Sequence, residues 1–377
     1  MQCYQGIGRN EKASVGREKE EKIVLTTNGG AIYMIRLNND YCRGAHPAVL
    51  EVLQETNNME YPGYGLDEWC QRGADRIREH LGGADVEIHF MLGGTQVNYT
   101  VIAAALRPYQ GVISADTGHI NNHEAGAVER TGHKIHVLPA VDGKLTAADI
   151  AKEAEHYKES GDADYLTQPK MVFLSFPSEY GTIYSKQELT EIHEVCRKYG
   201  MYLYVDGARL AYGLTAEGCD VTLADLAALT DVFSIGGTKC GALFGEAVVI
   251  RHPSLRDHFR TYLKQVGGML AKGWLLGLQF DTLFRDGLYF KLAAEANRQA
   301  MRIKQAFQTK GIPFWMDSVT NQQFVVLRRT QAAALAERYV FEFSHEVDEK
   351  HICVRFCTSW STDASAVDAL IRDIEKL

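Results

Sequence analysis

The sequence predicts an α/β protein built on a mainly parallel sheet, with a smaller α+β domain at its carboxyl end. Short apolar runs alternate with helical patterns through most of the chain, as in doubly wound sheets. Two of these runs, 202–206 and 233–236, end in polar residues, as buried parallel strands do where a sheet binds its ligand. Residues 286–377 contain a long helix, two strands and a final helix, which indicates the smaller domain.

The individual elements follow from their patterns. Apolar runs bounded by glycine or polar residues indicate strands at 87–92, 112–115, 134–138, 171–176, 202–206, 233–236, 241–250, 324–327 and 351–356. Apolar residues at helical spacing indicate helices at 48–56, 68–81, 147–158, 186–199 and 291–310, an alanine-rich helix ending near 106, and a carboxyl-terminal helix. Pro47 suits the first position of the first helix.

Length, charge and cysteine usage exclude several classes of protein. The 377 residues suffice for a large domain and a smaller one. The net charge of −8 argues against a nucleic-acid or anionic-membrane partner. No apolar run approaches the roughly 20 residues of a membrane span, and the first 25 residues lack the apolar core of a signal peptide. The eight cysteines show no zinc spacing, so we expect free thiols, no metal and a cytoplasmic location.

The amino-terminal segment differs in composition from the rest of the chain. It is rich in charged residues and has few apolar ones, so we expect residues 1–33 to be a poorly ordered or mis-assigned extension before Met34. The alternative is an arm that packs on a partner subunit. The expected organisation is an extension, a large domain with its amino-terminal segment, a connecting interface segment and a small domain, at 1–33, 34–250, 251–285 and 286–377.

Asp206 and Lys239 form the central candidate site. An acid and a lysine at the ends of neighbouring strands would suit pyridoxal phosphate (PLP). The lysine could hold the aldehyde as a Schiff base, and the acid could keep the pyridine nitrogen protonated so that the ring acts as an electron sink. Each residue alone also has an ordinary interpretation, because an Asp at a strand end is often a helix cap and a Lys after Gly-Gly is often a surface residue.

A second candidate site lies at Gly93-Gly94-Thr95, between a strand and the alanine-rich helix. Glycine lets a backbone approach a phosphate closely, and a helix amino terminus presents free N–H groups and positive potential. Strand, Gly-Gly-Thr and helix in this order are therefore a possible phosphate cradle.

The motifs around Asp206 and Lys239 resemble a known family. Asp206–Arg209, followed by Ser234–Lys239, is similar to the motif order of the low-specificity L-threonine aldolase / β-eliminating lyase family of fold-type-I PLP enzymes. Further similar motifs occur in the same order at Asn38–Pro47, Gly63–Asp67, His119–Gly126, Lys264–Gly273 and Val354–Trp360. The resemblance covers residues 34–377 and implies a seven-stranded, mainly parallel sheet and PLP as the cofactor.

The resemblance also implies roles for individual residues. Catalysis would fall to Lys239, Asp206, His119 and Arg209. Cofactor contacts would come from Lys239, Gly94, Thr95, His119, Asp206 and Arg209, with the phosphate on Gly94 and Thr95 and the His119 ring stacked on the cofactor. Substrate contacts would come from Asn39, Arg209 and Arg355, where a guanidinium binds a carboxylate by two parallel hydrogen bonds.

This sequence departs from the family at the residue expected to remove the β-hydroxyl proton, usually a histidine. Tyr165, Thr167 and Phe176 stand near the positions where the family often has histidines. We therefore expect His123, or a water held by His119, to take the proton. Tyr180 and Glu179 are the next candidates.

A second departure concerns the phosphate. Leu270 stands where the family often has an arginine after Gly-Gly-Met, in a segment that the family supplies from the neighbouring subunit. Lys264 or Lys272 is the possible substitute.

The resemblance implies PLP-dependent retro-aldol cleavage of L-threonine, L-allo-threonine or a related β-hydroxy amino acid to glycine and an aldehyde. It also implies a homodimer or homotetramer with active sites at the dimer interface. Two alternatives stay open. One is a β-eliminating lyase that yields a keto acid and ammonia, and the other is a non-catalytic binding protein on the same fold.

Overall fold

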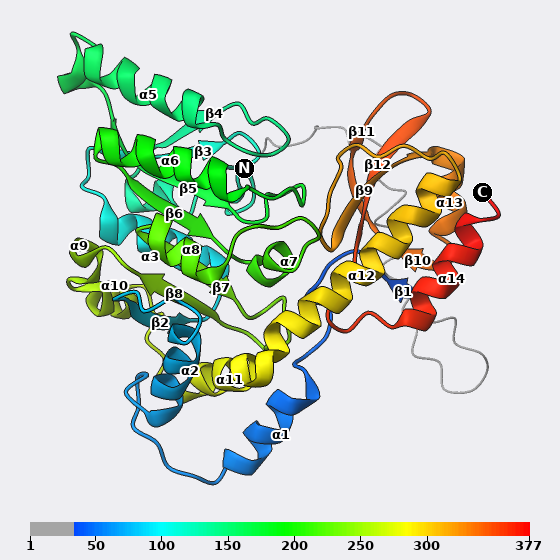
Figure 1. Ribbon diagram of the computed structural model, residues 1–377, viewed down its shortest axis with the longest axis horizontal. Helices are drawn as coiled ribbons and strands as arrows, with labels where there is room; N and C mark the ends of the chain where they lie inside the picture. Colours follow the sequence, from blue (N-terminus) through cyan, green and yellow to red (C-terminus); the bar gives the residue numbers. More distant parts are fainter. Residues whose placement is uncertain (1–33) are drawn as a thin grey trace, which may run out of the picture.

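The computed structural model describes residues 34–377, which form a large α/β domain and a smaller α+β domain (Figure 1). The long helix α12 (Leu288–Thr309) runs from the large domain into the small one. The expectation for residues 1–33 lies outside the described residues. The first described strand, β1 (Ile35–Arg36), pairs with β10 (Tyr339–Val340) of the small domain, and the following residues cross to the large domain.

A seven-stranded sheet forms the centre of the large domain in the described part of the chain. Its strand order is β2 (Glu87–Met91), β8 (Glu246–Ile250), β7 (Val232–Gly236), β6 (Tyr202–Asp206), β5 (Gln168–Ser175), β3 (Gln110–Ala115) and β4 (Ile135–Leu138). Only β8 runs antiparallel to its neighbours, so the predicted mainly parallel seven-stranded sheet is confirmed.

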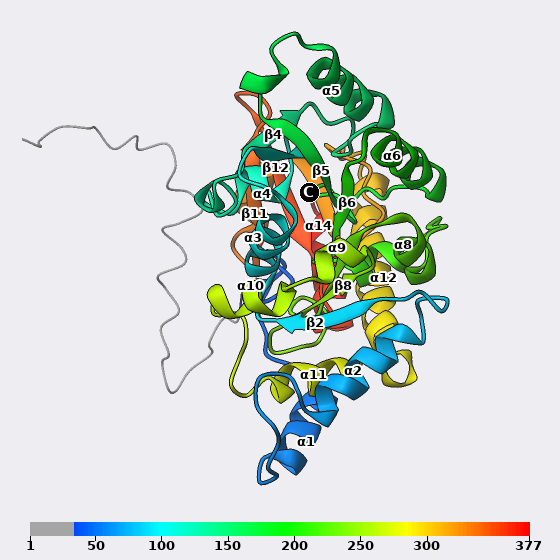
Figure 2. The same ribbon diagram turned by 90° about the vertical axis from the view of Figure 1, so that its left-hand side faces the viewer.

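Helices cover both faces of this sheet (Figure 2). One face packs against α5 (Ala147–Glu159), α6 (Lys186–Tyr199), α7 (Leu210–Leu214) and α8 (Leu223–Leu229). The other face packs against α3 (Gly94–Ala105), α9 (Pro253–Arg256) and α10 (Phe259–Gln265). The ends of α6 show how local sequence fixes these helices. Ser185 and Glu188 form a reciprocal capping box at its start, and Gly200 adopts a left-handed conformation at its end.

Several predicted boundaries differ from the observed ones, and one of these differences lies beside the site. We expected a strand from Gly241 to Ile250, but β8 begins only at Glu246. Gly241 and Gly245 have φ of 94° and 121°, values that interrupt a strand, so the chain turns here before pairing. The helix expected at 68–81 ends at Arg78 as α2 (Glu68–Arg78).

The lower edge of the large domain is built from α1 (Pro47–Thr56), α2 and α11 (Trp274–Phe284). Helices α2 and α11 cross at two glycines. A Cβ on Gly73 would lie 2.6 Å from the Gly277 carbonyl oxygen, and one on Gly277 would lie 2.3 Å from the Cys70 Cα. This close crossing places the turn before α2 against the turn before α11.

The small domain is a three-stranded antiparallel sheet covered by helices, which confirms its predicted α+β class. Its strand order is β11 (Glu342–Glu346), β12 (His351–Cys357) and β9 (Gln322–Arg328). Its core is closed by the carboxyl-terminal half of α12, by α13 (Arg329–Leu335) and by α14 (Ala364–Ile374). The carboxyl-terminal end of β12 contacts the segment that follows β1, where the Cys357 N–H donates to the Leu37 carbonyl at 2.7 Å.

Candidate active site

The ends of two adjacent strands bring Asp206 and Lys239 together. Asp206 is the buried last residue of β6, and Lys239 lies in the turn that follows β7. Because β6 and β7 are parallel, both ends reach the same edge of the sheet. Burial lowers the pKa of the Lys239 amine and the Arg209 guanidinium lowers it further, while nearby carboxylates, including Asp206, oppose both effects. The pair predicted from sequence is thus brought into one electrostatic environment.

The turn that carries Lys239 is fixed by its backbone. The N–H groups of Gly237 and Thr238 both donate to the Gly245 carbonyl, at 2.9 and 3.1 Å. The Tyr212 hydroxyl donates to the Lys239 carbonyl at 2.6 Å. The main chain of the lysine is therefore held in place.

Asn98 connects Asp206 to a second carboxylate. Its amide nitrogen donates to Asp206 Oδ2 at 2.9 Å and to Glu124 Oε1 at 2.7 Å, and its oxygen accepts from the Tyr204 hydroxyl at 2.5 Å. The other Asp206 oxygen accepts from the Ala208 N–H at 2.8 Å. Asn98 had no role in the sequence analysis, although it lies one helical turn after Gly94, where a helix starting at the cradle would return to the same face.

His119 continues this hydrogen-bonded chain. Its Nδ1 lies 2.7 Å from Glu124 Oε1, and its backbone N–H donates to Glu179 Oε1 at 2.8 Å. With Glu124 ionised, Nδ1 carries the proton and Nε2 remains an acceptor. The His123 ring lies 5.5 Å away, and burial lowers its pKa. Both histidines named in the sequence analysis therefore lie side by side.

Arg209 is engaged by a residue that sequence reasoning missed. Its Nε and one terminal nitrogen donate to the two carboxylate oxygens of Asp40, at 2.7 and 3.0 Å. Asn321 also donates to Asp40, at 3.0 Å. Burial alone would raise the pKa of the Asp40 carboxyl, but the charges of Arg209 and Lys239 and these hydrogen bonds hold it below its usual value. One guanidinium nitrogen of Arg209 lies outside this pair.

Arg355 reaches toward the large domain from β12. Its terminal nitrogens donate to Gln322 Oε1 at 3.1 Å and to the Asn38 carbonyl at 3.0 Å, and its buried Nε has no partner among the described residues. Arg355 also contributes to the lowered pKa of His123, which places its charge near that ring. Asn39 is adjacent in sequence to Asn38 and accepts from the Tyr41 N–H at 3.1 Å.

The amino terminus of α3 is open at Gly93 and Gly94. The helix has no side-chain cap, and a Cβ built on either glycine meets nothing within 4 Å. Thr95 is exposed beside them. The free N–H groups of the first turn can therefore receive an anion from solvent.

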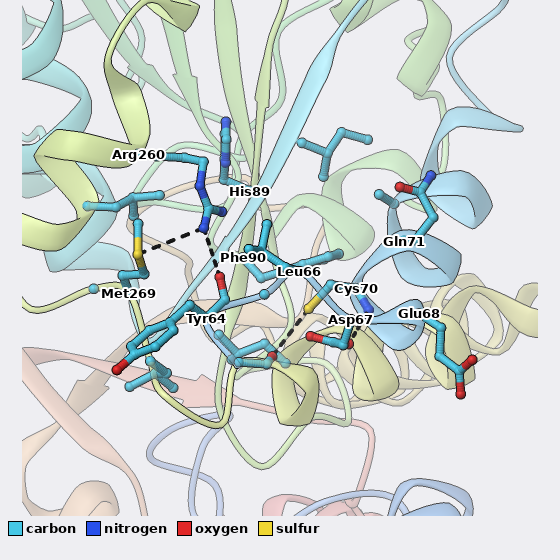
Figure 3. A pocket seen from close by; sticks show the side chains of 18 of the residues that line it. Tyr64, Leu66, Asp67, Glu68, Cys70, Gln71, His89, Phe90, Arg260 and Met269 are labelled. Carbon is cyan, nitrogen blue, oxygen red and sulfur yellow. Dashed lines mark hydrogen bonds between the residues drawn. The ribbon is translucent and has the colours of Figure 1, made fainter. Parts of the chain in front are cut away.

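The segment carrying Gly-Gly-Met lies beside this helix start within the same chain. Gln96 of α3 donates to the Val266 carbonyl at 3.3 Å. A pocket of about 440 Å³ joins this segment to the Gly-Tyr-Gly turn (Figure 3). Arg260 stands on its wall and donates to the Tyr64 carbonyl at 3.0 Å, and the Lys264 ammonium lies 4.8 Å from the centre of the Tyr64 ring.

Residues 34–377 show neither a candidate metal cluster nor a candidate membrane-spanning helix. No cluster of three or more His, Cys, Asp or Glu side chains suits a metal ion. None of the helices in this part of the chain combines the length and apolar character needed to cross a bilayer.

Comparison with known proteins identifies the family of the chain. The model of the beta-eliminating lyase family matches residues 44–330. The chain belongs to this family. Relatives in the beta-eliminating lyase family include the low specificity L-threonine aldolase of Pseudomonas aeruginosa, 31% identical over 89% of this chain and 96% of the relative. The enzyme of the same name from a Pseudomonas species is 29% identical, with the same coverage. The predicted family and the predicted lyase class are confirmed.

Solved structures of other proteins share the fold of this chain. A threonine aldolase from Leishmania major is 39% identical, covers 91% of this chain and 99% of its own, and superposes with a TM-score of 0.88. A putative L-allo-threonine aldolase from Listeria monocytogenes, 18% identical with a TM-score of 0.71 over 91% of this chain and 96% of its own, shares the fold. So does a serine palmitoyltransferase from Sphingomonas wittichii, 16% identical with a TM-score of 0.68 over 91% of this chain and 86% of its own. The predicted fold-type-I architecture of this beta-eliminating lyase family member is confirmed.

Proposed function

We propose that this protein uses PLP to cleave L-threonine, L-allo-threonine or a related β-hydroxy amino acid into glycine and an aldehyde. The observation that carries the proposal is the pairing of Lys239 with Asp206 at the ends of adjacent strands, in a chain whose relatives are named threonine aldolases. We further propose a cytoplasmic homodimer or homotetramer with active sites at the dimer interface.

The residues present fit PLP. A half-buried lysine with a lowered amine pKa is available for covalent attachment, a buried carboxylate for the ring nitrogen, and an uncapped helix terminus for the phosphate. When bound, PLP supplies an electron sink for the electron pair left on Cα when the Cα–Cβ bond breaks.

Side chains of the protein would hold the cofactor and orient the substrate. Asp206, held by Asn98, would accept a hydrogen bond from the ring nitrogen of PLP, and the His119 ring would pack against the cofactor. Arg355 orients the substrate carboxylate together with Arg209 and Asn39. Clamping the carboxylate selects the bond that breaks, because only a bond aligned with the cofactor's π system is cleaved.

The β-hydroxyl proton requires a base near His119. We propose a water held at His119 Nε2, since the Glu124 contact at Nδ1 leaves Nε2 as the acceptor. His123, whose pKa is lowered by burial, is the alternative base because it is neutral at physiological pH.

The test is incubation with L-threonine and L-allo-threonine, with glycine and acetaldehyde measured. Lys239→Ala should lose the visible absorbance of bound cofactor, with Lys198→Ala, whose side chain is 64% exposed, as the control. Loss of the band in Lys198→Ala but not in Lys239→Ala would overturn the assignment.

A second candidate is β-elimination on the same residues, which the description of the matching family favours. It yields a keto acid and ammonia in place of glycine and an aldehyde. Product analysis of the same incubation separates the two reactions.

A further inference from the structure

Glu246 is a buried carboxyl group that the proposed reaction does not use. It is the first residue of β8 and pairs with Met91 of β2 and Gly236 of β7. Cross-strand partners point to the same face of a sheet. Gly236 ends β7 just before the turn that carries Lys239, and a Cβ built on it would lie 2.3 Å from the Ala208 carbonyl oxygen, so the chain after Asp206 packs closely against this end of β7.

The strand pattern gives the direction of the Glu246 side chain. Met91, Val248 and Tyr204 pack into the core between the sheet and α3, and side chains two residues apart share a face. Glu246 is two residues from Val248, and Asp206 is two residues from Tyr204. Both carboxyl groups therefore point to the face that carries the α3 amino terminus.

One of the two oxygens of the Glu246 carboxyl lacks a hydrogen-bond partner in the described part of the chain. The residue is 4% exposed, and its Oε2 has no hydrogen-bond partner among residues 34–377. Burial raises its pKa to about 8 and Asp206 contributes in the same direction, while the Lys239 charge and hydrogen bonds from Thr238 and Gly237 oppose this rise. Glu246 in turn works to raise the pKa of Lys239. The two groups are close enough to influence each other, and both are driven toward their neutral forms.

Other charged or titratable groups also face this pair. Those near Glu246 are Asp206 and Tyr204 on β6, Tyr289 on α12 and Lys239 after β7. Those near Lys239 are Arg209, Asp40, Asp206 and Glu246. Asp206 is held by Asn98, and Asp40 is held by Arg209 and Asn321. Glu246 is the carboxyl in this set with an unpartnered oxygen.

We propose that Glu246 is the general acid–base group that serves Lys239 when the lysine bonds to its cofactor. This inference rests on the proposed function, since it concerns capture of PLP. Glu246 takes one proton from the Nζ ammonium, and the nitrogen lone pair then bonds to the aldehyde carbon. A second amine proton moves to the former carbonyl oxygen. Glu246 returns its proton to that hydroxyl, which leaves as water while the C–N double bond forms.

The test measures cofactor capture and needs no turnover. Full-length protein freed of cofactor is mixed with PLP at pH 6 to 9, and the rate of the absorbance change is followed. Borohydride reduction and peptide mass confirm attachment at Lys239. We expect Glu246→Gln to slow capture about 100-fold, the low end for general acid–base catalysis, while the amount captured at equilibrium is unchanged.

The chain offers a matched control and a rescue. Glu87→Gln removes the same charge from the far end of the β2–β8 pair, where its side chain is 47% exposed, and should capture PLP at the parental rate. Glu246→Ala leaves a space for a small acid. Formate, but not chloride at equal ionic strength, should restore its capture rate.

Glu246→Gln within about twofold of the parental rate at every pH would overturn the proposal, because general acid–base catalysis contributes far more. If that variant does not fold, Glu246→Ala without formate serves in its place, and a parental capture rate there would overturn the proposal equally. Slowed capture without formate rescue would also overturn it, since a structural role predicts that result. A chain that captures no PLP at any pH refutes the proposed function itself. If Glu246→Gln captures PLP at the parental rate and the parental protein cleaves threonine, only the role of Glu246 is refuted.

Discussion

Replacing Asp40 with asparagine removes the carboxylate that pairs with Arg209 while keeping nearly the same shape. The pair is bidentate, with contacts of 2.7 and 3.0 Å, and the Asp40 side chain is fully buried. The Arg209 side chain is 16% exposed, so the variant leaves a largely buried guanidinium without its counter-charge. Breaking one partner of a buried pair costs about 3–5 kcal/mol of unfolding free energy.

Urea titration of the parental protein and Asp40→Asn at pH 7 measures this loss. Glu346→Gln is the matched control, because it breaks an ion pair with Arg329 in which both side chains are about half exposed. Exposed pairs are worth at most about 1 kcal/mol, so the control should remain near the parental stability.

The loss should also depend on pH in a defined direction. The Asp40 pKa lies below its ordinary value of 3.8, because the charges of Arg209 and Lys239 outweigh the effect of burial. A carboxyl with a lowered folded-state pKa stabilises the protein above its unfolded pKa, and that stabilisation is lost as pH falls through the folded pKa. The difference between parent and variant should be constant down to about pH 5 and shrink below about pH 4. A loss under about 1 kcal/mol at pH 7, or a difference that grows in acid, would refute this account of the pair.

Three further outcomes follow from the site. Asp206→Asn should retain PLP but lose about 10²–10³ in kcat, the usual effect of removing one preorganised electrostatic contact, and near-parental turnover would remove Asp206 from the mechanism. Arg355→Lys should raise KM for threonine with little change in kcat, because the charge stays while the planar fork is lost; an unchanged KM would place the carboxylate elsewhere. His119→Phe keeps the stacking surface but removes the acceptor, so threonine cleavage should slow while cofactor affinity is spared. If His119→Phe and His123→Phe both cleave threonine at the parental rate, Tyr180 or Glu179 becomes the next base to test.

The ends of the central strands could be predicted from the sequence because their signals are local. The apolar runs before Asp206 and Lys239, and the Gly-Gly-Thr before α3, each identify their position within a few residues. The resemblance to threonine aldolases then supplied the roles of residues such as His119 and Arg355, which no local pattern indicates.

The remaining parts of the site depend on distant contacts. Asp40 and Arg209 are 169 positions apart, and no sequence pattern around either residue predicts that they form an ion pair. The late start of β8 was missed because Gly245 adopts φ 121°, a conformation that an apolar run does not reveal. The same error hid Glu246, which a continuous strand from Gly241 would have placed in the middle of a buried run.

The hydrogen bonds of the Asn98 side chain limit how this enzyme can be redesigned. The Asn98 amide nitrogen contacts both Asp206 and Glu124, and Glu124 in turn contacts the His119 ring. Replacing Asn98 therefore changes the hydrogen bonding of Asp206 directly and that of His119 through Glu124. A library randomised at Asn98 would mix changes in ring-nitrogen basicity with changes in histidine orientation, and selection could not separate them. Independent adjustment would have to enter through Tyr204, which contacts only the amide oxygen of Asn98 in this chain of hydrogen bonds, or through Glu124.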